Sequence, residues 1–464
     1  TATPLTLYKR LLAIYPSLTL DQPRTKEMER KINSVAVLGG GTMGAGIAAL
    51  CAQKDKKVLL LEINEAAAEQ ARDRIINGRP PSLDDPEKAK NITIGTFNND
   101  LKKIENYDWI CEAVVEDLEI KRDLFKRLEP LRRDGSIVST NTSGITLSDI
   151  TEGMPDRLLK DVAVTHFFNP VKVMRLLELV PGQKTTPDVT QDLRDFCSNV
   201  LGKGVVDAKD TVNFIGNRIG CYWILAGLHY GIEALNEGFN VEEVDAMISQ
   251  SMGLPPTGLF GLVDLVGLDV MDLVSKNLSD NLPSEDLGLK FVNLPGSVRD
   301  MIDRGQIGRK AGGGFYRVQK LDDGSRKSET FDVITGKWRE TIKSESSGAP
   351  ITLEAMFEDH NQGKLLWQIV GGTLIYAADL IPEISDDVVN VDRAMRWGYA
   401  WSEGPFQLLD KLGPKKFSSR IVSENGTNPK MLTALNKAGA EKFYLEEEEK
   451  FFSVGGDYKQ IPAD

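Results

Sequence analysis

Residues 35–52 read VAVLGGGTMGAGIAALCA, eighteen residues with one hydroxyl group and no charge. Two structures could explain such a stretch. A transmembrane helix needs about 20 apolar residues, and the three consecutive glycines from Gly39 to Gly41 would each weaken a helix by about 1 kcal/mol relative to alanine. No comparable segment recurs in the chain. The stretch therefore favours a strand, a glycine turn and a helix over a membrane span.

The order of residue types in this stretch is typical of a dinucleotide-binding fold. Residues 34–38 are a short β-branched run suited to a buried parallel strand. The glycines that follow form GxGxxG, in which the first allows a tight turn, the second lets a pyrophosphate approach, and the third lets helix and strand pack closely. The amides at the start of the next helix would bind that pyrophosphate. The predicted pyrophosphate-binding residues are Gly39, Gly41, Thr42, Met43 and Gly44.

An acidic residue strengthens this prediction, because GxGxxG alone is a weak signal. A second apolar run, VLLLE, ends in Glu62, eighteen residues after Gly44. A carboxylate at that position accepts hydrogen bonds from the ribose hydroxyls and repels a 2′-phosphate. We therefore expect a Rossmann-type domain that binds NAD rather than NADP.

Composition excludes several classes of protein. The 464 residues carry a formal net charge of −12, which argues against binding to nucleic acid. The four cysteines show no paired spacing and are interpreted as reduced thiols. The three histidines lie far apart in the chain, so we expect no metal site. Residues 1–30 show no signal peptide, and a cytoplasmic location is expected.

Alternating strands and helices continue after Glu62. The segment 119–131 places Ile120, Leu124, Leu128 and Leu131 at helical spacing. Beyond residue 210 the pattern becomes mostly helical. The strands predicted in this part of the chain are 107–115, 136–141, 162–170 and 175–180, of which the last closes the series.

A repeat marks the second half of the chain. Residues 244–267 resemble residues 391–413, at an offset of 146 to 147 residues with one small gap. Two copies of one helical unit, packed face to face, are therefore expected. The fold class is thus an α/β Rossmann-type domain followed by two related all-helical domains. The predicted segments are 1–30 (an unassigned arm), 31–209 (the NAD-binding domain), 210–317 (the first helical domain), 318–350 (a linker or surface hairpin) and 351–464 (the second helical domain and tail).

His166 is the strongest candidate for acid–base chemistry. Oxidising an alcohol with NAD requires a base for the hydroxyl proton, and a free histidine titrates at about 6.5. Glu178 lies twelve residues later in the next predicted strand, beyond a turn that contains Asn169 and Pro170. Antiparallel pairing would bring this carboxylate to the imidazole and fix its tautomer. The alternative is a histidine satisfied at a turn and a surface glutamate.

Several further motifs together resemble the L-3-hydroxyacyl-CoA dehydrogenase family. They are THFFNP (165–170), NTS (141–143), EAVVE (112–116), NR (217–218) and GRKAGGGFY (308–316), together with GxGxxG. The likeness spans about residues 31–317, and the repeat extends it towards residue 413. The duplicated helical unit resembles the long multifunctional β-oxidation proteins, although no enoyl-CoA hydratase domain is recognisable.

The resemblance implies roles for individual residues. His166 would be the general acid/base and Glu178 its orienting partner. Ser143 and Asn217 would hold the reacting oxygen or the acyl group. Glu116 and Lys121 would lie in the cleft near the cofactor and the pantetheine. Ser143 could instead cap a helix, and Asn217 could be an ordinary helix residue.

The resemblance also implies an activity and partners. It predicts NAD-dependent oxidation of an (S)-3-hydroxyacyl-CoA thioester in fatty-acid β-oxidation, by a monomer or homodimer that is linked to or associated with an enoyl-CoA hydratase. Two alternatives stay open. One is a related dehydrogenase of a free hydroxy acid, and the other is a non-catalytic NAD-binding scaffold.

Overall fold

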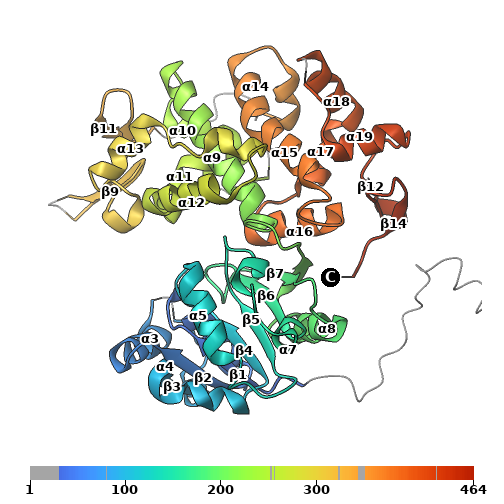
Figure 1. The fold of residues 1–464 in the computed structure, drawn as a ribbon. Helices are drawn as coiled ribbons and strands as arrows, with labels where there is room; N and C mark the ends of the chain where they lie inside the picture. The colour runs from blue at the N-terminus through green and yellow to red at the C-terminus, as the bar shows by residue number, and fades with distance from the viewer. Residues whose placement is uncertain are drawn as a thin grey trace, which may run out of the picture.

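The computed structural model describes residues 31–79, 81–250, 253–254, 257–321, 324–342, 351–424 and 426–463. The predicted arm, 1–30, lies outside the described residues, as do residues 251–252 and 255–256 of the first repeat copy. The described chain forms two layers, with the large sheet and its helices in one and the C-terminal helices in the other (Figure 1). Within the described residues, no helix is long and apolar enough to span a membrane.

The first layer is built on an eight-stranded sheet with the order β3-β2-β1-β4-β5-β6-β7-β8. The strands β1 to β6 run parallel, whereas β7 pairs antiparallel with β6 and parallel with β8. The strands are β1 (Ser34–Leu38), β2 (Lys57–Glu62), β3 (Ile92–Thr96), β4 (Trp109–Glu112), β5 (Ile137–Thr140), β6 (Val162–Phe167), β7 (Leu176–Pro181) and β8 (Gly204–Asp207).

The predicted strands differ from the observed sheet in three respects. The run 175–180 does not close the series, because β8 follows it at the edge of the sheet. β3 at the opposite edge was not predicted either. The expected strand 107–115 is shorter, since β4 ends at Glu112 and the chain then turns into the loop that follows.

Helices cover both faces of the sheet. The helices α2, α3 and α8 pack on the face that carries Val35 and Val37, and α5 packs on the face that carries Ala36 and Leu38. Their bounds are α2 (Thr42–Gln53), α3 (Glu65–Asn77), α4 (Phe97–Asp100), α5 (Leu118–Leu128), α6 (Leu147–Ile150), α7 (Asp156–Leu159) and α8 (Pro187–Asp195).

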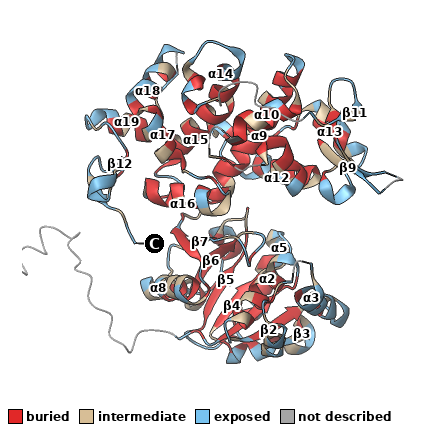
Figure 2. Ribbon diagram, turned by 180° about the vertical axis from the view of Figure 1, so that it is seen from behind, coloured by how far each residue is buried: buried red, intermediate tan, exposed pale blue. Residues whose placement is uncertain are grey.

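The second layer surrounds one buried helix, α9 (Gly216–Asn236). Figure 2 shows that buried residues concentrate in the sheet and along the inner helices of this layer. The remaining helices of the first unit are α10 (Val241–Gln250), α11 (Gly258–Val266), α12 (Leu268–Asn281) and α13 (Gly296–Asp303). Those of the second unit are α14 (Asn361–Leu366), α15 (Gly372–Leu380), α16 (Val388–Gly398), α17 (Pro405–Leu412), α18 (Pro414–Ser423) and α19 (Lys430–Lys437).

The two units repeat the same hydrogen bonds. In the first, Asp245 accepts the amides of Phe260 and Gly261 and the hydroxyl of Tyr316. In the second, Asp392 accepts the equivalent amides and the hydroxyl of Tyr444. Burial raises the pKa of both carboxyls to about 7. The sequence repeat therefore corresponds to a structural one.

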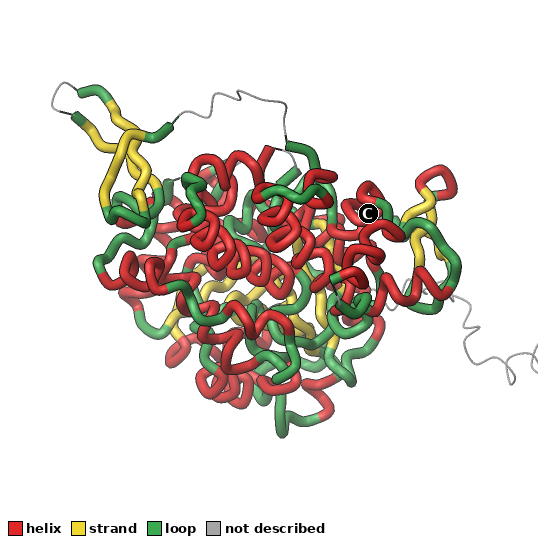
Figure 3. The backbone as a smooth tube through the Cα atoms, turned by 90° about the horizontal axis from the view of Figure 1, so that it is seen from above, coloured by secondary structure: helices red, strands yellow, loops and turns green. Residues whose placement is uncertain are grey.

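The two units had been expected to be all-helical, but neither is. Each ends in a small antiparallel sheet, and the two sheets project on opposite sides of the helical layer (Figure 3). The first, made of β9 (Tyr316–Lys320), β10 (Arg326–Asp332) and β11 (Lys337–Glu340), occupies most of the segment interpreted as a linker or surface hairpin. Residues 322–323 and 343–350 of that segment lie outside the described residues. The second sheet contains β12 (Tyr444–Leu445), β13 (Lys450–Phe452) and β14 (Tyr458–Gln460).

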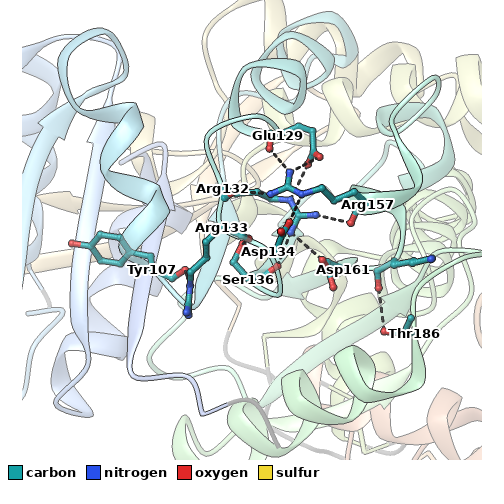
Figure 4. Close-up of polar contacts among 10 residues, drawn as sticks. Tyr107, Glu129, Arg132, Arg133, Asp134, Ser136, Arg157, Asp161 and Thr186 are labelled. Atoms are coloured by element: carbon teal, nitrogen blue, oxygen red, sulfur yellow. Dashed lines mark hydrogen bonds and ion pairs between the residues drawn. The ribbon is translucent and has the colours of Figure 1, made fainter. Parts of the chain in front are cut away.

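A cluster of buried ion pairs lies where α5 ends and β5 and β6 begin (Figure 4). The side chain of Arg132 is fully buried, and its guanidinium contacts Glu129 at 2.8 Å and Asp161 at 3.0 Å. Arg157 also binds Glu129, at 2.7 Å, and donates to the carbonyl of Arg132. These contacts join the end of α5 to the starts of β5 and β6 and leave no buried carboxylate of the cluster unpaired.

Candidate active site

The glycine turn borders a cavity of about 1140 Å³ beyond the ends of the central strands. Gly39 has φ +102°, and a Cβ there would lie 2.6 Å from the carbonyl oxygen of Ala113. A Cβ on Gly44 would overlap the carbonyl oxygen of Gly39, whereas a Cβ on Gly41 would meet nothing within 4 Å. No side chain caps α2. The turn thus offers open backbone and helix amides to an anionic group, as a dinucleotide requires.

Glu62 lies at the rim of the same cavity. Its Oε1 accepts the amide of Gly40 at 2.6 Å, and its Oε2 accepts the amide of Ile63 at 2.9 Å. Both contacts hold the carboxylate beside the glycine turn. Thr42 and Met43 also line the cavity, so five of the six predicted cofactor residues of the turn and of β2 border it, and the sixth, Gly44, packs against the Gly39 carbonyl.

His166 and Glu178 lie opposite each other on β6 and β7. The antiparallel pairing expected for these strands is confirmed. Nδ1 of His166 lies 2.6 Å from Oε2 of Glu178, and both side chains are almost fully buried. The other carboxylate oxygen accepts the amides of Ile215 at 3.0 Å and Gly216 at 2.7 Å, at the start of α9. Because the backbone holds one oxygen, the other stays directed at the imidazole.

Ser143 connects the histidine to the cavity. Its hydroxyl lies 3.1 Å from Nε2 of His166, and the residue also lines the cavity wall. Oε1 of Glu116 accepts the amides of Ser143 and Gly144, each at 2.8 Å, and the hydroxyl of Thr142 at 2.7 Å. Glu116 therefore lies in the cleft and shapes the loop that carries Ser143.

Lys121 lies behind the cleft wall, although it was expected within the cleft. Its side chain is 1% exposed, and its ammonium contacts Glu112 at 2.8 Å and Glu116 at 3.3 Å. Burial lowers the pKa of Lys121, but the two carboxylates outweigh burial and raise it. Burial likewise raises the pKa of Glu116, and Lys121, Thr142 and the two loop amides reverse that shift. Lys121 thus holds Glu116 in its ionised form.

Asn217 lies in the first turn of α9, next to the amides that bind Glu178. Its Oδ1 accepts the hydroxyl of Tyr399 at 2.8 Å. Tyr399 follows α16 in the second helical unit, so the two units meet beside the histidine. Nothing near Asn217 in the sequence indicates this partner.

Comparison with known families covers both layers. The NAD binding domain of 3-hydroxyacyl-CoA dehydrogenase matches residues 34–211, and its C-terminal domain matches residues 214–318. The chain belongs to the 3-hydroxyacyl-CoA dehydrogenase family. Membership in this family confirms the resemblance seen in the motifs, the fold class of the first domain and NAD as its cofactor.

Three relatives illustrate the extent of the match. A Bacillus subtilis protein described as a probable 3-hydroxyacyl-CoA dehydrogenase is 34% identical over 94% of this chain and 58% of its own length. A Rickettsia felis protein described as a fatty acid oxidation complex trifunctional enzyme is 35% identical over 82% of this chain and 53% of its own length. The structure of 3-hydroxybutyryl-CoA dehydrogenase from Escherichia coli K12 has a TM-score of 0.66 at 25% identity and covers 88% of this chain and 99% of that protein. The chain spans little more than half the length of the longer curated relatives.

The sequence analysis missed other residues that line the cavity beside the glycine turn. Ile63, Val115 and Ile120 are large apolar side chains, 66%, 63% and 48% exposed, and all three line the cavity. Ile63 directly follows the acid that ends β2, and Val115 follows β4 closely. Their positions just after buried strands are a signal that could have identified them, because ligands bind beyond the carboxyl ends of parallel strands.

Proposed function

We propose that this protein catalyses the NAD-dependent oxidation of an (S)-3-hydroxyacyl-CoA thioester to the 3-oxoacyl-CoA. One arrangement supports the proposal above all: His166 lies between the carboxylate of Glu178 and the hydroxyl of Ser143, and Ser143 borders the glycine-lined cavity. A base, its orienting acid and a dinucleotide site are thus adjacent. Family membership supplies the substrate class.

His166 acts as the general base in the proposed reaction. Bound NAD supplies the hydride acceptor for C3 of the substrate. The Glu178 carboxylate accepts a hydrogen bond only from a protonated Nδ1, which leaves Nε2 unprotonated and able to take the proton of the C3 hydroxyl. The same carboxylate stabilises the imidazolium that results. The reverse reaction returns this proton to the carbonyl oxygen.

Ser143 and Asn217 act on the reacting oxygen. The Ser143 hydroxyl is already within hydrogen-bond distance of Nε2, so an oxygen bound to Nε2 would also lie near Ser143. A hydroxyl and an amide N–H are donors that stabilise negative charge as it develops on that oxygen. Both donors stand on rigid elements, the loop held by Glu116 and the first turn of α9.

The oxidation of NADH with acetoacetyl-CoA tests this function. We expect rapid turnover with NADH and the thioester. Little turnover is expected with NADPH, because Glu62 repels a 2′-phosphate. Little is also expected with free acetoacetate, because the proposed substrate is a CoA thioester. Turnover of free acetoacetate would favour the alternative of a hydroxy-acid dehydrogenase. Tight NADH binding without turnover of short or long acyl thioesters would favour the scaffold alternative and overturn the proposal.

We further propose that the enzyme works in fatty-acid β-oxidation in the cytoplasm, as a monomer that is linked to or associated with an enoyl-CoA hydratase. The relative described as a trifunctional enzyme supports the association. The contacts of the buried Arg218 on α9 with Tyr376 and Glu383 of the second unit support the monomer, because one chain buries what two would otherwise share. Sedimentation of the purified protein tests the oligomeric state against the chain mass of 51.2 kDa.

A further inference from the structure

The second helical unit contributes a side chain to the site. The Tyr399 hydroxyl donates a hydrogen bond to Oδ1 of Asn217, across 182 residues of sequence. We propose that Tyr399 is a positioning residue: it holds the Asn217 carboxamide so that Nδ2 faces the reacting oxygen of the substrate. This inference rests on the proposed function, in which Asn217 acts as a donor.

The surrounding packing leaves room for this tyrosine. A Cβ on Gly220, one turn after Asn217 on α9, would overlap the Tyr399 ring. The ring also meets Phe168 edge to face, with centroids 6.2 Å apart, and Phe168 lies 4.6 Å from the His166 ring. The ring of Phe168 therefore lies between Tyr399 and His166, while the Tyr399 hydroxyl contacts Asn217 directly.

The backbone around Tyr399 is anchored to the sheet and to the first unit. Helix α16, which precedes it, packs against α9, β7 and β8. Its Asn390 accepts the amide of Asp207 at 3.0 Å, and the Arg175 guanidinium stacks 4.1 Å from the Trp397 ring. Ala400 adopts φ +55°, a left-handed conformation that non-glycine residues rarely adopt. These contacts fix the tyrosine relative to the strand that carries Glu178.

The chemistry of the carboxamide explains why its orientation matters. An amide oxygen is only an acceptor, and an amide nitrogen is only a donor. A donor stabilises the developing charge on the substrate oxygen, whereas the amide oxygen would repel it. Burial raises the pKa of the Tyr399 hydroxyl well above its usual value, and the nearby Cys221 and Glu178 add to the shift. The hydroxyl therefore remains protonated and can donate to Oδ1.

A double-mutant cycle tests the inference. It uses wild type, Tyr399→Phe, Asn217→Ala and the double variant, with kcat and KM measured for acetoacetyl-CoA and NADH. Tyr399→Phe removes one neutral hydrogen bond, and the free energy of such bonds corresponds to a kcat that is about five- to tenfold lower. KM for NADH should stay unchanged. In the Asn217→Ala background the same substitution should change kcat less than twofold. Tyr458→Phe is the matched control, because its hydroxyl binds the Lys442 carbonyl in the small terminal sheet.

Two results would overturn the inference. One is a wild-type kcat in Tyr399→Phe, and the other is an equal fold loss in both backgrounds, which would mark a general packing defect. Absence of wild-type turnover with both short and long acyl thioesters would refute the proposed function instead. The urea-unfolding midpoints of the same four proteins would then decide: non-additive shifts support the Tyr399–Asn217 contact, and additive shifts exclude it.

Discussion

Replacing Glu178 by glutamine tests how this carboxylate controls the protonation of His166. One carboxylate oxygen accepts the amides of Ile215 and Gly216, and the other lies 2.6 Å from Nδ1 of His166. In Glu178→Gln the amide oxygen should stay with the two backbone donors, because an NH₂ group there would face them without an acceptor. The NH₂ group would then donate to Nδ1, and the ring proton would move to Nε2.

The expected loss of activity follows from this change of tautomer. A protonated Nε2 cannot accept the proton of the substrate hydroxyl. General base catalysis contributes about 10²–10⁴ in rate, and an analogous loss of the orienting carboxylate in serine proteases costs about 10⁴. We expect kcat for Glu178→Gln to fall by about 10²–10⁴, which corresponds to ~3–5 kcal/mol of transition-state stabilisation.

The assay is the steady-state oxidation of NADH with acetoacetyl-CoA, together with the reverse reaction. The values of kcat/KM should fall by the same factor in both directions, because a variant cannot change the overall equilibrium. NADH affinity, measured by fluorescence titration, should stay unchanged. Glu242→Gln, another glutamate held by hydrogen bonds but placed beside the first small sheet, is the control and should keep full activity. A kcat within tenfold of wild type, with normal NADH binding, would refute the tautomer argument.

Three further predictions concern the glycine turn, the buried ion pairs and the repeated aspartates. Gly44→Ala should lower the melting temperature, because its methyl group overlaps backbone, whereas Gly41→Ala should leave melting unchanged and weaken NADH binding; calorimetry and fluorescence titration separate the two effects. Arg132→Met should lower the free energy of unfolding in urea by ~3–5 kcal/mol, because it removes the buried guanidinium from Asp161 and one of the two guanidinium partners of Glu129; the partly exposed Arg133→Met should change it by at most about 1 kcal/mol, and equal losses would contradict the account of the cluster. Burial raises the pKa of Asp392 to about 7 from 3.8, so the folded protein retains a proton that the unfolded chain has lost; this stabilisation is complete below pH 3.8 and disappears as the pH rises through about 7. Relative to Asp392→Asn, wild type should therefore gain about 2 kcal/mol on going from about pH 7.5 to about pH 5, and a difference independent of pH would be inconsistent with this burial.

The centre of the sheet is more predictable from sequence than its edges. β1 and most of β2 are fully buried, so they appear as continuous apolar runs. β3 is largely half-buried and contains Gly95, and β8 has only four residues. Edge strands need less apolar surface because one side faces water or a loop, and their sequences therefore resemble those of turns.

The choice of which side of α5 is buried shows a second limit of sequence patterns. Ile120 has the helical spacing of a core residue, yet it is 48% exposed and lines the cavity. Lys121 takes the buried position instead, because Glu112 and Glu116 neutralise its charge. Hydrophobic spacing cannot indicate that a lysine will meet two carboxylates, since those partners come from other elements.

Sequence separation decides which parts of the site could be predicted. His166 and Glu178 are twelve residues apart on consecutive strands, so the pairing of neighbouring strands was enough to bring them together. Tyr399 reaches Asn217 only because the second unit packs against both α9 and the sheet. The repeat predicted that a second unit exists, but not which of its side chains would face the first.

The role of His166 is tested most directly by assaying His166→Gln beside wild type with NAD and the (S) or (R) enantiomer of 3-hydroxybutyryl-CoA. Wild type should form NADH from the (S) enantiomer alone. His166→Gln should bind NADH as wild type does and form it about 10²–10⁴ times more slowly. Turnover by this variant within threefold of wild type would contradict the assignment of His166 as the base that takes the substrate proton.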